Sequence, residues 1–403
     1  MRILMVSRWL WEERRRNGGA PGFFGELAQA IVAKGIDLTI LSQAADAGPI
    51  PEPRPGDGLN LHVFSRDGRS LALSPLDKIL KLWSGYRKPA TDAAIIRRFV
   101  REHGPFNVVV AQCEEPDGLA CALASLSGEF PPVVTYVHDL RYQFRPEGFR
   151  FIRKSSLGFV FRQSARVVAN SAQTAKWLQR EYGVPENKIG ECRIHLTAPF
   201  LARTAQKSIP IEPSERRILF LGALNQKKAP DLFLCAAILL AREHADLTFV
   251  LVGPETSENL RYRSMVKVFA TSPALAGRVE MLGRLEPSAV IDQIRRARVV
   301  VCPSLIETFS RTTIEALALG RPVIVTETTG AAHWVQSTGC GSVVPPNNVR
   351  ALADAIRNWI LRETIPDASA TITSELTASL AAEDWLRETR TAINAQPGNS
   401  RDS

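Results

Sequence analysis

Short apolar segments alternate with amphipathic stretches of helical period along most of the chain, and this alternation constrains the fold more than any other feature. Apolar runs of four to six residues are typical of buried strands, and apolar residues at every third or fourth position are typical of helices packed on a sheet. Strands that alternate with helices form parallel sheets, because a helix is the usual connection between parallel strands. The sequence therefore predicts an α/β protein with doubly wound parallel sheets.

The alternation pauses once, at residues 202–217 (ARTAQKSIPIEPSERR), which are polar and show no period. Such a stretch is typical of an interdomain linker. Strands are expected before it at Ile3–Val6, Asp37–Leu41, Asn107–Ala111, Val133–Val137 and Arg166–Ala169, and after it at Ile218–Leu221, Thr248–Val252, Val279–Leu282, Val299–Cys302, Val323–Thr326 and Ser342–Val344. Helices are expected at Phe24–Ala33, at Ala172–Tyr182 with Ser171 as cap, and at Leu380–Ile393.

The length of 403 residues favours two domains. The expected parts are an N-terminal domain at 1–201, the linker at 202–217, a C-terminal domain at 218–366, a helical segment at 367–395 that returns to the first domain, and a flexible tail at 396–403. Two such domains create a cleft, and open sheets bind ligands beyond the carboxyl ends of their strands. Loops that follow strands are therefore the places to look for functional residues.

Composition excludes several classes of protein. The chain is 45% hydrophobic and 23% charged, and its longest apolar run, Leu232–Ala241, has ten residues, whereas a spanning helix needs about 20. The N-terminus is interpreted as a first strand and not as a signal peptide, so we expect a cytoplasmic protein. The six cysteines lack metal-ligand spacing and are expected to be free, buried thiols.

The most informative segment is Val299–Val325 (VVVCPSLIETFSRTTIEALALGRPVIV). A strand leads into a loop that holds Glu307, and a helix follows from about Arg311 to Leu319, with Glu315 inside it. The start of a helix offers unbonded N–H groups and about half a positive charge, which suits phosphate. Carboxylates accept hydrogen bonds from sugar hydroxyls. An isolated pair of glutamates is more often an ordinary surface pair, so the surrounding residues decide the interpretation.

Pro303-Ser304, Glu307-Thr-Phe-Ser310 and a second glutamate eight positions after the first resemble the E-x7-E signature of glycosyltransferase family 4. The resemblance extends over most of the chain and is strongest from Ile218 to Trp359. It implies the GT-B fold, in which two Rossmann-like doubly wound parallel-sheet domains face each other across a cleft. It also implies a glycosyltransferase that retains the anomeric configuration of a nucleotide-sugar donor. By this resemblance, the domain at 1–201 is the acceptor-side domain and the domain at 218–366 binds the nucleotide sugar.

The resemblance assigns roles to the motif. Glu307 corresponds to the glutamate that contacts the donor sugar, and Glu315 to the one that binds the ribose. The main-chain amides of Phe309, Ser310 and Arg311 correspond to those that hold the sugar and diphosphate. Most family members have glycine where this chain has Ser310, and its side chain is expected to narrow the sugar pocket.

A second patch, Leu219–Asp231, resembles the strand, loop and helix that clamp the diphosphate in this family. Gly222 and Lys228 match that pattern, and Lys228 would supply one positive charge. The usual arginine is replaced by Ala223, so Lys227 or Arg311 is the candidate substitute. Without this context, a pair of lysines is ordinarily a solvated face.

In the first half, Gly18 and Gly19 resemble the family's glycine loop, where backbone approaches the donor, although a simple turn explains them equally well. His138 ends an apolar strand and matches a histidine near the donor sugar. It is our second catalytic candidate after Glu307. The implied chemistry uses no protein nucleophile and depends on charge and position. No D-x-D motif is present, so we expect no metal and no cofactor other than the nucleotide-sugar co-substrate.

Residues 141–166 hold seven basic residues, one acid and six interleaved aromatic residues, and the net charge of residues 1–200 is +7, against +2 for the rest. This pattern fits a face toward anionic lipid or a polyprenyl-diphosphate-linked or saccharide acceptor, with no match to a nucleic-acid-binding module. The basic residues proposed for this face are Arg141, Arg145, Arg150, Arg153 and Lys154. The alternative places the aromatic residues in the core and the arginines in solvent.

The sequence thus predicts transfer of a hexose to a lipid-linked or saccharide hydroxyl, in bacterial cell-surface polysaccharide or lipopolysaccharide synthesis, by a cytoplasmic enzyme peripheral to the membrane. Two alternatives keep the fold: a GT-B epimerase, and a nucleotide-sugar-binding sensor without transferase activity. A dinucleotide oxidoreductase is excluded because residues 17–22 (NGGAPG) do not give G-x-G-x-x-G.

Overall fold

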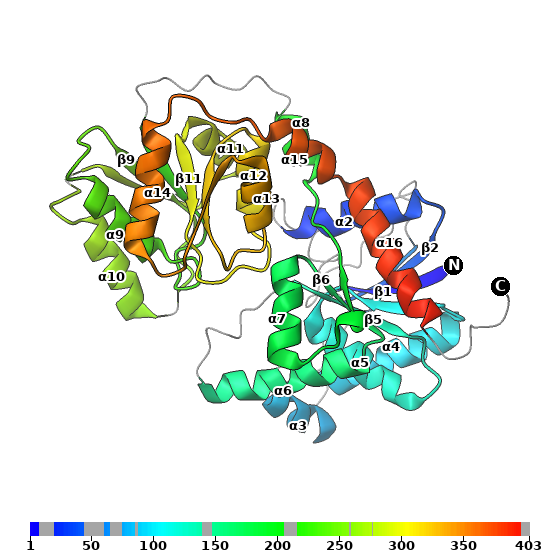
Figure 1. Cartoon of the computed structure of the whole chain (residues 1–403). Helices are drawn as coiled ribbons and strands as arrows, with labels where there is room; N and C mark the ends of the chain where they lie inside the picture. The colour runs from blue at the N-terminus through cyan, green and yellow to red at the C-terminus, as the bar shows by residue number, and fades with distance from the viewer. Residues whose placement is uncertain are drawn as a thin grey trace. The chain divides into compact units, whose positions relative to one another are not determined.

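The computed structural model describes residues 1–7, 20–43, 60–64, 75–84, 88–138, 147–204, 216–257, 259–275 and 277–395. Two compact units emerge, Met1–Thr197 with Thr377–Ser403, and Ala198–Leu376. Each unit contains one sheet, and all strand pairs in both sheets are parallel (Figure 1). The predicted α/β class with two Rossmann-like sheets is confirmed.

The first unit has a seven-stranded sheet in the order β3-β2-β1-β4-β5-β6-β7. Its strands are β1 (Arg2–Val6), β2 (Asp37–Gln43), β3 (Asn60–Phe64), β4 (Val108–Ala111), β5 (Val133–Val137), β6 (Arg166–Ala169) and β7 (Ile189–Glu191). The central strands β1, β4 and β5 consist almost entirely of buried aliphatic residues, which is what a sheet covered on both faces requires. Two strands that the sequence did not predict, β3 and β7, form the two edges.

Helices cover this sheet: α2 (Ala20–Val32), α3 (Pro75–Ser84), α4 (Pro89–His103), α5 (Leu119–Ala124), α6 (Glu147–Gln163), α7 (Ala172–Tyr182) and, from the far end of the chain, α16 (Ala378–Asn394). Helix α7 has the predicted bounds because its ends are coded locally. The Ser171 hydroxyl accepts a hydrogen bond of 3.1 Å from the Thr174 N–H, and Gly183 ends the helix in a left-handed conformation.

The second unit has a six-stranded sheet in the order β10-β9-β8-β11-β12-β13. Its strands are β8 (Arg217–Leu221), β9 (Thr248–Val252), β10 (Val279–Gly283), β11 (Val299–Cys302), β12 (Val323–Thr326) and β13 (Gly341–Val344). Its helices are α8 (Ala198–Thr204), α9 (Pro230–Leu240), α10 (Leu260–Ala270), α11 (Pro287–Arg296), α12 (Arg311–Ala318), α13 (Ala332–Thr338), α14 (Val349–Leu361) and α15 (Ser369–Glu375). The core joins central strands to α9 and α14, with Phe220, Phe233 and Trp359 buried.

The unit boundaries differ from the predicted domains. Helix α8 falls in the second unit, so the first ends at Thr197 and not at 201. Helix α15 packs against α12 and buries Ile372 in the second unit. The return to the first unit therefore begins at Thr377 and not at residue 367. Residues 205–215 of the predicted linker and the tail 396–403 lie outside the described residues.

The described residues contain no helix that is long and apolar enough to cross a membrane. All six cysteines are free; five of them are buried, as expected, and Cys235 is only half-buried.

Candidate functional site

Glu307 and Lys228 meet in the second unit. Lys228 lies in the loop after β8 and Glu307 in the loop after β11, and these strands are neighbours in the sheet. Because the strands are parallel, their carboxyl ends meet at one edge, where Lys228 Nζ donates a hydrogen bond to Glu307 Oε2. Their side chains are 25% and 12% exposed. The first catalytic candidate and a donor-binding candidate thus form one ion pair.

Backbone hydrogen bonds between neighbouring loops fix the position of Glu307. The Leu305 N–H donates to the Lys227 carbonyl oxygen at 2.9 Å, which ties the loop after β11 to the loop after β8. On the other side, the Glu307 N–H donates to the carbonyl oxygen of Thr328 at 3.1 Å, and the Gly330 N–H donates to the backbone carbonyl oxygen of Glu307 at 2.9 Å. The carboxylate therefore extends from a backbone that is held on both sides.

The side chain of Lys228 runs beside Gly222. A Cβ placed on Gly222 would lie 3.6 Å from Cγ and Cδ of Lys228, which is an ordinary van der Waals distance, so the lysine stem lies beside this glycine without requiring it. The Lys228 N–H donates to Asn225 Oδ1 at 3.1 Å, which orders the turn before α9.

Helix α12 begins directly after the loop of Glu307. Ser310, its N-cap, adopts φ +81°, a region that favours glycine. The Ser310 hydroxyl shares a hydrogen bond of 2.8 Å with that of Thr313, and the residue is buried. The hydroxyl is thus engaged within the first turn of the helix. The first N–H groups of α12 have no carbonyl partner inside the helix, which favours an anion at this end.

Phe309 and Glu315 flank this turn. Phe309 is buried, and its carbonyl accepts a hydrogen bond of 2.7 Å from the Ala331 N–H. Glu315 pairs with Arg311 one turn before it, at 3.4 Å. Burial raises the pKa of Glu315, and Arg311 opposes this shift. Arg311 is therefore partly committed to Glu315 and is only in part available to replace the arginine missing at Ala223.

In the first unit, His138 follows β5, and its backbone N–H donates to Glu114 Oε2 at 3.0 Å. Its ring lies edge-on to Phe24 at 5.2 Å and parallel to Tyr136 at 6.4 Å between centroids. Glu114 follows β4, the strand next to β5. The sequence reasoning missed Glu114, although its place after an apolar strand is the signal that selected His138.

One predicted face residue is contradicted. Arg153 Nη1 lies 2.5 Å from Glu115 Oε2, and the two side chains are 16% and 2% exposed. Burial raises the pKa of Glu115 to about 7 against the opposing effects of Arg153 and Ser156. Arg153 is therefore an internal counter-ion and not part of a lipid-facing surface.

Other predicted positions divide into two groups. Lys154 is half-exposed and pairs with Glu181 at 3.1 Å. Gly18, Gly19, Arg141 and Arg145 lie outside the described residues, as does the side chain of Arg150. Within the described ranges, no cluster of three His, Cys, Asp or Glu side chains is placed to hold a metal ion.

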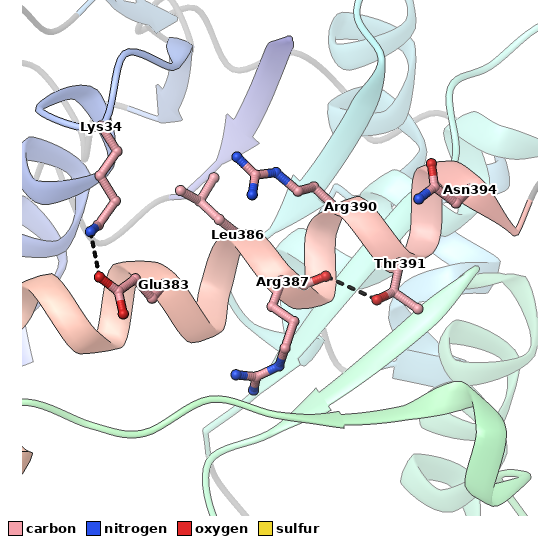
Figure 2. Close-up of a pocket in the computed structure, with 7 residues that line it drawn as sticks. All are labelled: Lys34, Glu383, Leu386, Arg387, Arg390, Thr391 and Asn394. Carbon is pink, nitrogen blue, oxygen red and sulfur yellow. Dashed lines mark hydrogen bonds and ion pairs between the residues drawn. The ribbon is translucent and has the colours of Figure 1, made fainter. Parts of the chain in front are cut away.

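A groove of about 410 Å³ lies between the end of α2 and helix α16 in the first unit (Figure 2). Lys34 and Glu383 form an ion pair of 2.8 Å across it, and Arg387 and Arg390 also line it. Lys34 precedes β2, whereas His138 follows β5. The groove contains none of the predicted site residues, so it is not the candidate active site.

Two family profiles match the chain. The profile described as Glycosyltransferase Family 4 matches residues 17–190, and the one described as Glycosyl transferases group 1 matches residues 202–373. Together they cover most of both units.

Individual proteins agree with these profiles. A D-inositol 3-phosphate glycosyltransferase of Rhodococcus opacus is 32% identical over 213 residues, half of this chain and 46% of the relative's length. The lipopolysaccharide core biosynthesis mannosyltransferase LpsB of Rhizobium meliloti is 25% identical over 70% of this chain and 82% of its own. Among solved structures, Anabaena HepE in complex with UDP and glucose superimposes with a TM-score of 0.66 at 17% identity, covering 96% of this chain and 98% of its own. The predicted GT-B fold is thereby confirmed.

Proposed function

Because the chain belongs to glycosyltransferase family 4, we propose that it transfers a hexose from a nucleoside-diphosphate sugar to a hydroxyl group of a saccharide or polyprenyl-diphosphate-linked acceptor, with retention of the anomeric configuration. The observation that carries the proposal is the meeting of Lys228 and Glu307 beside the first turn of α12. A cation, a carboxylate and a set of helix N–H groups are the groups needed to bind a diphosphate and the sugar attached to it.

Each group has a distinct task in this proposal. Lys228 and the N–H groups of α12 stabilise negative charge on the departing diphosphate. Glu307 accepts hydrogen bonds from the hydroxyls of the sugar and holds its anomeric carbon in place. Glu315 accepts hydrogen bonds from the ribose. Lys228 is preorganised by Glu307, so donor binding redirects a cation that is already in position.

The relatives guide the choice of substrates. HepE binds UDP and glucose, which makes UDP-glucose the first donor to test. LpsB acts in lipopolysaccharide core synthesis, and this supports an acceptor from bacterial cell-surface polysaccharide. The D-inositol 3-phosphate glycosyltransferases make inositol phosphate a necessary member of the acceptor panel.

The decisive experiment compares wild type with Glu307→Gln and Lys228→Met on UDP-, GDP-, ADP- and TDP-sugars. Thermal stabilisation reports binding, and nucleotide release reports transfer or hydrolysis. One nucleotide class is expected to stabilise the wild type, and Glu307→Gln is expected to lower release by about 100-fold. Glu243→Gln and Lys267→Met are matched controls, because both residues are exposed in the same unit.

Several results would contradict the proposal. Release unchanged in Glu307→Gln would remove that residue from the chemistry. Donor binding without release, with every acceptor tried, would favour a sensor. Release should persist in EDTA because we propose a metal-independent reaction, and an inverted product anomer would exclude retention.

A cytoplasmic location and a peripheral contact with anionic membrane complete the proposal, since a polyprenyl-linked acceptor lies in a bilayer. Because Arg153 is an internal counter-ion, a membrane contact would use another surface of the first unit.

A further inference from the structure

Helix α3 of the first unit exposes two large aliphatic side chains. Leu76 is 54% exposed and Ile79, one turn later, is 63% exposed. Asp77 and Leu80, on the inner side of the same helix, are buried. The outer side of α3 therefore presents apolar surface that the described part of the unit does not cover.

The charges on α3 are also divided between its two sides. Asp77, the only acid of the helix, faces α4, where its carboxylate accepts hydrogen bonds from the N–H of Ala90 at 2.9 Å and from the hydroxyl of Thr91 at 2.6 Å. Lys78 and Lys81 are exposed, and neither forms an ion pair with any residue that the structure describes. The outer side thus combines two aliphatic side chains with two positive charges that pair with none of the described residues.

We propose that the outer side of α3, formed by Leu76, Lys78, Ile79 and Lys81, docks on an anionic lipid bilayer. Aliphatic side chains enter the boundary between headgroups and acyl chains, and lysines extend to the lipid phosphates. Lipid phosphates supply an opposite charge for both lysines, whereas an apolar protein surface supplies none. A bilayer therefore fits this surface better than an apolar protein partner. Docking itself does not depend on the proposed function. Its role, which is to bring the first unit to a lipid-linked acceptor, rests on that proposed function.

The inner side of α3 is firmly attached to the unit. Trp83 stacks edge-on against Phe159 of α6 at 5.6 Å, and its Nε1–H donates to Ser155 Oγ at 3.3 Å. Figure 1 shows α3 beside α6, and the two helices are in contact. Ile152 of α6 is also partly exposed, at 38%. The helix can therefore transmit docking to the whole unit.

Helix α10 of the second unit provides a matched comparison. Leu260 and Val268 are 70% and 65% exposed there, so aliphatic exposure alone does not distinguish α3. Two of the three cations of α10, Arg263 and Lys267, pair with Glu255, at 2.6 Å and 3.5 Å, whereas Arg261 is exposed and forms no ion pair with a described residue. Helix α3 differs from α10 because both of its cations lack a described ion-pair partner and its one acid is buried.

The test measures co-sedimentation of the full chain with vesicles of phosphatidylcholine, with and without phosphatidylglycerol, in the absence of donor and acceptor. Wild type is expected to bind only the anionic vesicles. Leu76→Ser with Ile79→Ser should lower the partition coefficient about tenfold or more. Lys78→Gln with Lys81→Gln should lower it about tenfold at low salt, and this difference should shrink at high salt. Leu260→Ser with Val268→Ser is the control and should bind like wild type.

Three results would overturn the inference: no binding of wild type to anionic vesicles, equal binding of the α3 variants, or α3 variants that convert a dimer into a monomer. Thermal unfolding verifies that each variant is folded. Nucleotide release with a water-soluble acceptor should be unchanged in all α3 variants. Loss of lipid binding and loss of transfer are therefore separate results, and failure of one proposal does not imply failure of the other.

Discussion

Two adjacent acids, Glu114 and Glu115, contact different partners in the first unit. Glu114 accepts the N–H of His138, while Glu115 turns to α6 and pairs with Arg153. A sequence shows that two acids follow a strand, but not which way each side chain faces. For the same reason Arg153 was assigned to a surface: its partner, Glu115, lies 38 positions earlier.

Glu114 is expected to position His138, so Glu114→Ala should reduce kcat/KM with little effect on the global fold. The substitution removes a hydrogen bond to a charged acceptor, which corresponds to about 1.5 to 3 kcal/mol, or roughly 10- to 100-fold if the histidine is displaced. Steady-state kinetics with the donor that the nucleotide-sugar panel selects would measure this reduction. Glu114→Gln, which keeps an acceptor oxygen, should recover most of the activity, and equal losses in both variants would exclude a positioning role.

At the scale of elements, the predictable parts were those coded by local sequence. Strands β5, β6, β9, β11 and β12 have the predicted bounds because each is a short run of buried apolar residues. Strands β3 and β7 were missed because edge strands are partly exposed and lack such a run: β7 has three residues, of which only Gly190 is buried. They are strands because they pair with β2 and β6, and this pairing cannot be seen in the sequence.

Helix α16 is held to the first unit by a buried network of charges. Asp384 accepts hydrogen bonds from Arg193 at 2.6 Å and from Arg387 at 2.7 Å, and Glu388 accepts one from Arg166 at 2.6 Å. Glu388 passes so close to β7 that a Cβ on Gly190 would lie 2.1 Å from its carboxylate. The helix therefore needs a glycine at this point of the sheet.

This network predicts a pH dependence of stability. Burial raises the pKa of Asp384, but hydrogen bonds from Arg193 and Arg387 outweigh it, so the net pKa is lowered. A carboxyl with a lowered folded-state pKa stabilises the protein above its unfolded pKa of about 3.9, and this contribution is lost as the pH falls. Asp384→Asn should therefore cost about 2 kcal/mol from pH 7 down to about pH 5, and progressively less as the pH falls below about 4, measured by denaturant unfolding.

Glu383→Gln on the same helix is the control. Glu383 is 55% exposed and pairs with Lys34 at the surface, so its loss should cost less than about 1 kcal/mol. If the cost of Asp384→Asn stays constant as the pH falls, the stabilising role of the ionised carboxylate is wrong.

At the scale of the whole molecule, the chain leaves its first unit, builds the second, and returns. The sequence predicted a return, but not where it begins, because α15, with seven residues, and α16, with 17 residues, are separated by only two residues. What distinguishes them is the surface that each covers: Ile372 is buried in the second unit and Trp385 in the first. The family motifs selected Lys228 and Glu307 as candidates, whereas their ion pair depends on the order of strands in the sheet.

If α16 belongs to the first unit, the two buried tryptophans should act on different units. Trp385 is fully buried and stacks on Tyr136 of β5 at 6.0 Å, and Trp359 of α14 is 3% exposed in the core of the second unit. Trp385→Ala should leave a cavity that costs about 3 to 5 kcal/mol, and faster amide hydrogen exchange should appear mainly in β4 to β7. Trp359→Ala, with the same chemical change, should accelerate exchange mainly in β8 to β13. Equal acceleration in both sheets by either variant would mean that the units unfold as one, whereas acceleration of the second sheet by Trp385→Ala would show that α16 stabilises that unit instead.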